Sequence, residues 1–95
     1  MDTERTNITR EVGSRIRYAR KSRGMSMDEL AQAIYKTRSA ISKYENGQIS
    51  VDIATLYDIA NALKVSIYDL LHRNTPDIGQ AYNAEVPAFF RNVSQ

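Results

Sequence analysis

The chain has 95 residues, of which 42% are apolar, so it is long enough for one domain with a single modest core. It contains no cysteine, one histidine and no long apolar run, which excludes disulfides, metal clusters of these residues and membrane spans, and indicates a cytoplasmic protein. The net charge is only +2, but residues 1–24 hold seven basic and three acidic residues. This asymmetry favours a polyanionic binding partner. The alternative is that the basic residues form an ordinary solvated helix face.

The first predicted element is an amphipathic helix in the basic part of the chain. Val12, Ile16 and Ala19 recur at spacings of four and three, as on one face of a helix. Gly24 supplies the left-handed residue that commonly closes a helix. Residues 1–10 are polar, so we expect them to form a flexible N-terminal arm.

Two short helices follow, each with its own capping signal. Ser26 and Glu29 have the spacing of a capping box at the start of the second helix. Thr37 is the expected N-cap of the third helix, which ends at Gly47. Two short helices joined by a three-residue link form the helix-turn-helix pattern.

Two further helices complete the predicted domain, which covers residues 11–72. Asp52 begins the fourth helix, and Ser66 with Asp69 marks the start of a short fifth one. No convincing strand alternation is present, so the predicted class is all-α with five helices. The fourth helix is expected to face inward with Ile53, Leu56, Ile59, Ala60 and Leu63.

Residues 73–95 form a predicted C-terminal extension. Prolines and a glycine argue against one long helix, but Ile78, Tyr82 and Val86 keep a four-residue spacing. We expect a short helix over 78–86 that docks on the domain or on a second subunit, with disorder as the alternative.

The third helix has two different faces. Ala40, Ile41 and Tyr44 are spaced to face inward together. The outward face carries residue types that can bind DNA bases. Basic side chains can donate to guanine in the major groove, and serine hydroxyls can bond several base edges. The same residue types also occur on ordinary surface helices. The outward stripe consists of Ser39, Ser42, Lys43 and Asn46, with Arg38 at the N-terminal end.

The segment VGSRIRYARKSRGMSMDELAQAIYKTRSAISKYENGQISVDIATLYDIANALKVSIYDLL resembles the lambda-repressor-like (Cro/XRE-type) helix-turn-helix DNA-binding domain over about 60 residues. The landmarks RIR, RG, DELA, ISKYENG and LYDIANALKVS occur in register. The resemblance implies a transcriptional regulator, such as a repressor, that binds a palindromic double-stranded DNA operator as a homodimer. It implies neither enzyme activity nor a cofactor. The alternative is a protein-interaction module or antitoxin-like regulator whose tail, residues 73–95, holds a protein partner.

The resemblance also implies roles for individual residues. The second helix of the motif would read bases. The basic residues of the domain's first helix, the start of the motif's first helix and the two ends of its second helix would contact phosphates. The expected base-reading residues are Arg38, Ser39, Ser42 and Lys43. The expected DNA-backbone contacts are Arg15, Arg17, Lys21, Met27, Thr37, Asn46 and Gln48.

Two sets of residues are expected to act within the protein itself. A carboxylate near DNA is repelled, and the resemblance implies that Glu45 is paired with Arg20 in a structural bridge. Ile67, Tyr68 and Leu71 correspond to a dimer interface.

The sequence departs from the family pattern in three places. Met27 replaces a frequent glutamine, and Tyr35 stands where the turn usually has glycine, which predicts a left-handed residue there or a differently shaped turn. Residues 47–51 contain no lysine or arginine, although relatives often have basic residues in this loop.

No set of residues in the sequence suggests catalysis. Paired carboxylates, metal-ligand spacing, a glycine-rich phosphate loop and a nucleophile with its base are all missing from the sequence. We therefore expect no metal, no membrane association and no enzyme.

Overall fold

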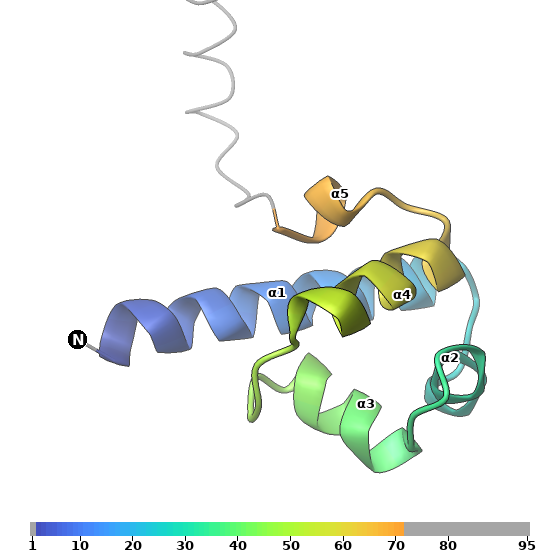
Figure 1. The fold of residues 1–95 in the computed structure, drawn as a ribbon, viewed down its shortest axis with the longest axis horizontal. Helices are drawn as coiled ribbons and strands as arrows, with labels where there is room; N and C mark the ends of the chain where they lie inside the picture. Colours follow the sequence, from blue (N-terminus) through green and yellow to red (C-terminus); the bar gives the residue numbers. More distant parts are fainter. Residues whose placement is uncertain (1, 72–95) are drawn as a thin grey trace, which may run out of the picture.

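The computed structural model describes residues 2–71, which form five helices and no strand. The expected helix over 78–86 lies outside the described residues. No helix within residues 2–71 has the length and apolarity needed to span a membrane. The elements are α1 (Asp2–Ser22), α2 (Met27–Ala33), α3 (Arg38–Glu45), α4 (Ile53–Leu63) and α5 (Ile67–Leu71) (Figure 1).

Helix α1 is longer than the sequence predicted. The part of the expected flexible arm that the structure describes, from Asp2 onward, is instead helical, and it projects past the other helices at the blue end of the ribbon (Figure 1). The Thr9 hydroxyl donates to the carbonyl of Arg5 at 3.0 Å and lies 3.2 Å from the hydroxyl of Ser50. This contact joins the end of the segment to a residue far along the chain.

The structure confirms the predicted helix caps. Each cap is a hydrogen bond between residues three positions apart, so its spacing could be read from the sequence. Ser26 and Glu29 form the reciprocal capping box, at 2.8 and 3.0 Å. The Thr37 hydroxyl accepts from the amide of Ala40 at 3.1 Å at the start of α3. Asp52 caps α4 through the amide of Thr55, and Ser66 and Asp69 bond each other's amides at α5.

The core lies where all five helices meet. It is built from large aliphatic side chains at helical spacing, in line with the predicted inward faces. The prediction that Ile53 faces inward is wrong. Ile53 is 67% exposed because it lies at the edge of the buried stripe of α4, and Thr55 is buried in this helix instead. The fully buried side chains are Ile16, Leu30, Ile41, Leu56, Ile59, Leu63 and Leu70.

Helices α1 and α3 approach each other at Gly13. A Cβ atom at this position would collide with the carbonyl oxygen of Tyr44 and lie 2.9 Å from that of Glu45. Any side chain there would push the two backbones apart. Gly13 therefore sets how closely α3 packs against the long first helix.

Tyr35, in the turn between α2 and α3, has a left-handed backbone with φ +59°, one of the two outcomes expected from the sequence. Its side chain is 95% exposed, so packing does not offset the strain of about 1–2 kcal/mol. Gly24 has a similar φ of +67°, and a Cβ there would have no atom within 4 Å. The two positions therefore isolate the cost of a left-handed backbone.

We predict that Tyr35→Gly raises the free energy of unfolding and that Gly24→Ala lowers it, each by about 0.5–1 kcal/mol. Each net change is the difference between the backbone strain and the entropy that glycine adds to the unfolded chain, because these two effects oppose each other. Urea denaturation of both variants measures the two changes. Changes of the same sign would contradict this assignment of backbone strain.

Candidate nucleic-acid interface

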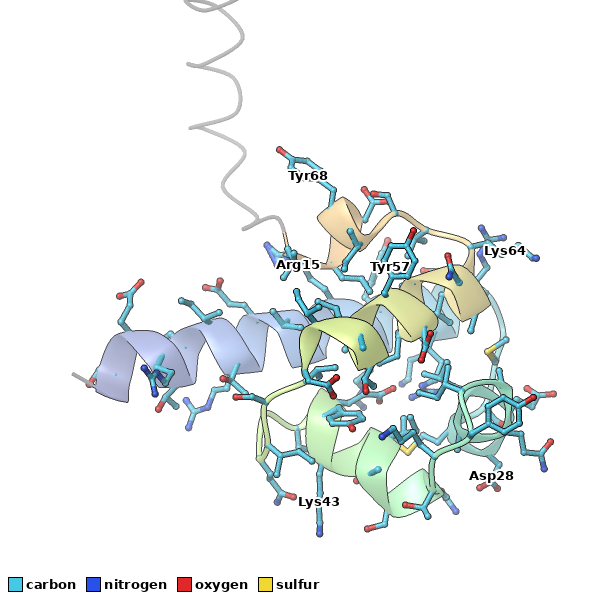
Figure 2. The ribbon with its side chains drawn as sticks, in the orientation of Figure 1. Arg15, Asp28, Lys43, Tyr57, Lys64 and Tyr68 are labelled. Carbon is cyan, nitrogen blue, oxygen red and sulfur yellow. The ribbon has the colours of Figure 1, made fainter. Side chains whose placement is uncertain are left out.

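The outward stripe of α3 is open to solvent. Arg38, Ser39 and Lys43 are exposed, and Ser42 is half-buried. The side-chain amide of Asn46 donates to the Ser42 hydroxyl at 3.3 Å, which aligns the last turn of the stripe. Figure 2 shows Lys43 directed away from the rest of the domain. The structure thus brings the four expected base-reading residues onto one accessible face.

The opposite face of α3 fixes this stripe in place. Ile41 is completely buried, Tyr44 is buried, and Ala40 packs against the core. With only eight residues, α3 is too short to be stable alone in water. Its position depends on this packing and on its contacts with α1.

Arg20 and Glu45 form the bridge expected from the sequence. Arg20 Nε donates to Glu45 Oε2 at 2.6 Å, and Arg20 Nη2 donates to Oε1 at 3.0 Å. A third nitrogen, Nη1, donates to the carbonyl of Met25 at 2.8 Å. Both side chains are buried, and the hydrogen bond to Glu45 raises the pKa of the Arg20 guanidinium above its ordinary value against the opposing effect of burial.

The bridge has a second effect on the electrostatics of the stripe. Both oxygens of the Glu45 carboxylate accept from Arg20 in the protein interior, so the charge of the last residue of α3 is paired. The exposed charged side chains of this helix are the two cations Arg38 and Lys43. The surface presented by α3 is therefore positive.

The expected backbone contacts fall into different surroundings. Thr37 and Gln48 are exposed on either side of α3, and Lys21 is exposed in the last turn of α1. Arg17 is exposed and lies one helical turn from Gly13 on the same stripe, and Gly13 touches α3. The side chain of Met27 packs against the core and is only partly exposed.

Arg15 lies on a different side of α1 from the α3 stripe. It lines a hollow between α1 and α5 together with Tyr18 and Tyr68. Figure 2 shows Arg15 near α5 and Lys43 on the opposite side of the domain. The sequence grouped Arg15 with Arg17 by charge, but two positions along a helix point in nearly opposite directions.

The expected dimer residues lie on α5, away from α3. Tyr68 is 65% exposed and Leu71 is 45% exposed, whereas Ile67 is half-buried and packs against the core. Residues 73–95, expected to extend this surface, lie outside the described part of the chain.

Residues 16–70 match the helix-turn-helix family HTH_3. The chain belongs to this family. The match confirms the all-α helix-turn-helix class expected from the sequence and agrees with the expectation that the chain is not an enzyme.

One relative bears the name of a regulator. The chain is 36% identical over 61 residues to an uncharacterized transcriptional regulator in the ATPase CF(0) region of Rhodospirillum rubrum, which covers 64% of this chain and 56% of the relative. The chain therefore spans little more than half the length of that relative.

Two solved structures are similar in fold. The restriction-modification controller protein C.AhdI from Aeromonas hydrophila is 28% identical with a TM-score of 0.66, covering 68% of this chain and 94% of its own. An HTH_3 transcriptional regulator from Vibrio cholerae is 30% identical with a TM-score of 0.68, covering 77% and 40%. The chain thus has the helix-turn-helix fold of DNA-binding regulators.

Sequence reasoning missed two residues of α1 that shape this interface. Gly13 allows the close approach of α3, and Arg10 packs against the loop after α3. Both share a helical stripe with Arg17 at spacings of three and four, which was a readable signal. Assigning residues 1–10 to an arm concealed the continuation of that stripe.

We predict that Glu45→Gln lowers the free energy of unfolding by about 3–5 kcal/mol, because it leaves the buried Arg20 charge without its counter-ion. Thermal and urea denaturation measure the loss. Glu29→Gln, at the exposed capping box, is the matched control and should cost less than about 1 kcal/mol. Equal stability of the Glu45→Gln variant and the wild type would rule out the bridge as a structural element.

Proposed function

We propose that this protein is a sequence-specific transcriptional regulator that places α3 in the major groove of double-stranded DNA. One observation carries the proposal: α3 is fixed by a buried face and a buried ion pair, while its other face is exposed and positive. Arg38, Ser39, Ser42 and Lys43 would read base edges from that face. The family match and the regulators among its relatives support the same function.

Other exposed residues would hold the domain on the DNA without reading its sequence. Arg17 and Lys21 would attract phosphates from α1, and Thr37, Asn46 and Gln48 would contact the backbone at the ends of α3. Arg15 is left out of this set because it faces α5.

One such domain reads only a few base pairs, so specificity normally requires two domains on neighbouring half-sites. Tyr68 and Leu71 offer exposed apolar surface on α5, with Ile67 at its edge. This surface is separate from the α3 stripe, so a homodimer formed there would leave both α3 helices free. A symmetric dimer would then bind a palindromic operator.

We predict that selection from a random pool of DNA duplexes enriches a palindrome with the wild-type chain. Arg38→Ala and Lys43→Ala should each lose preference at particular base positions, since a good bidentate base contact contributes about 1–3 kcal/mol of discrimination. Sequencing of the selected pools gives the preference at every position.

Lys64→Ala is the control for this experiment, because Lys64 ends α4 and lies away from Lys43 (Figure 2). Uniform weakening at all positions would make Arg38 and Lys43 phosphate contacts instead. Failure to enrich any palindrome would favour the alternative of a protein-interaction module.

We predict that Leu71→Glu converts a homodimer into a monomer, because a carboxylate would be buried without a partner at the α5 interface. Sedimentation velocity at several concentrations measures the change. Tyr35→Glu, which alters an exposed aromatic residue in the α2–α3 turn, should leave the dimer intact. A Leu71→Glu variant that still sediments as a dimer would place the interface elsewhere.

A further inference from the structure

The loop that follows α3 lacks cations of its own. Residues 47–51 contain no lysine or arginine, although this loop lies directly after the helix that would enter the major groove. A cation beside this loop would neutralise the phosphates that border the groove on this side, and phosphate neutralisation supplies much of the affinity for DNA.

The structure brings a cation to this loop from another helix. A Cβ atom on Gly47 would lie 2.8 Å from Cγ and 3.0 Å from Cα of Arg10, so the helix and the loop are in direct contact. The hydroxyls of Thr9 and Ser50, 3.2 Å apart, form a second contact one residue away on α1. Two adjacent residues of α1 thus hold the loop.

Gly47 is required for this arrangement on two grounds. Its φ of +73° lies in the left-handed region that disfavours side chains, and its missing Cβ leaves room for the methylenes of Arg10. Arg10 is therefore in close contact with Gly47. The first carbons of its side chain, which carry the guanidinium, are held beside the loop.

Arg10 belongs to the α3 side of α1. It lies three residues before Gly13 and seven before Arg17, so the three share one helical stripe. Gly13 meets the backbone at the end of α3, which places Arg10 and Arg17 on either side of that contact. Arg10 is exposed to solvent, so its charge is accessible to a ligand approaching α3.

We propose that the N-terminal part of α1 is a second DNA-contacting element, in which Arg10 binds a backbone phosphate beside the loop after α3. It supplies the positive charge that the loop itself lacks. The proposal rests on the proposed DNA-binding function and adds a residue and an element to it. Since a phosphate carries no sequence information, Arg10 contributes affinity and leaves base preference unchanged.

The test compares the salt dependence of operator binding for the 95-residue chain and three variants of it. The probe is the duplex enriched by the wild type, and fluorescence anisotropy gives Kd over a series of potassium chloride concentrations. Arg10→Gln, which keeps the first methylenes against Gly47 and removes the charge, should reduce the slope of log K against log salt by about 0.9. Arg10→Lys should restore the wild-type slope.

Arg15→Gln is the matched control, because it removes the same charge from the same helix on the side that faces α5. Its slope should equal that of the wild type. Thermal denaturation of each variant shows whether folding is intact, and the recovery by Arg10→Lys separates a charge effect from a packing effect.

The outcomes separate the two proposals. A wild-type slope in Arg10→Gln, or an equal reduction in Arg15→Gln, overturns the assigned phosphate contact while DNA binding stands. A wild-type chain that binds no duplex overturns the proposed function and this contact with it. Reduction in Arg10→Gln alone, with unchanged base preference, supports the contact.

Discussion

The buried ion pair between Arg20 and Glu45 is the interaction on which the arrangement of this domain depends. Helix α3 has eight residues, and its three inward apolar side chains direct one face toward the core. The two-point hydrogen bonding between a planar guanidinium and a carboxylate adds a directional constraint on the rotation of the helix about its axis. Because desolvation offsets most of the attraction within a buried pair, the net contribution of the pair to stability is small compared with the cost of removing one partner. The bridge and the buried apolar face together therefore determine which side of α3 faces outward.

The bridge requires that α1 and α3 lie very close together, and Gly13 permits this. The carbonyl oxygens of Tyr44 and Glu45 occupy the space where a Cβ of Gly13 would be. The contact lies seven residues, or two helical turns, from Arg20 on the same side of α1. Helix α1 thus holds α3 at two points, one polar and one made by backbone alone. The outward stripe of α3 is held in place for the same reason, as the proposed contacts with base edges would require.

The parts of this structure that the sequence predicted are those with short-range causes. The caps at Ser26, Thr37 and Asp52 join side chains to amides three residues away, so their spacing is sufficient evidence. The helical start of α1 was not predicted, because its contact between Thr9 and Ser50 spans 41 positions. Within the site, the stripe on α3 could be read from periodicity. The same periodicity was present on α1 but was not applied to its basic residues, so Arg15 was grouped with Arg17 although two positions along a helix point in nearly opposite directions.

The distribution of charge along the sequence also fails to show which charges lie close together in the fold. Counted along the chain, the loop at residues 47–51 has no cation and the first 24 residues have an excess, as if the two features were unrelated. In the fold they meet, because Arg10 packs on Gly47. If Arg10 binds a phosphate as proposed, the loop needs no basic residue of its own, provided that α1 is long enough to reach it and that residue 47 has no side chain. The extra helical turns of α1, the glycine and the uncharged loop are therefore best understood as one structural unit.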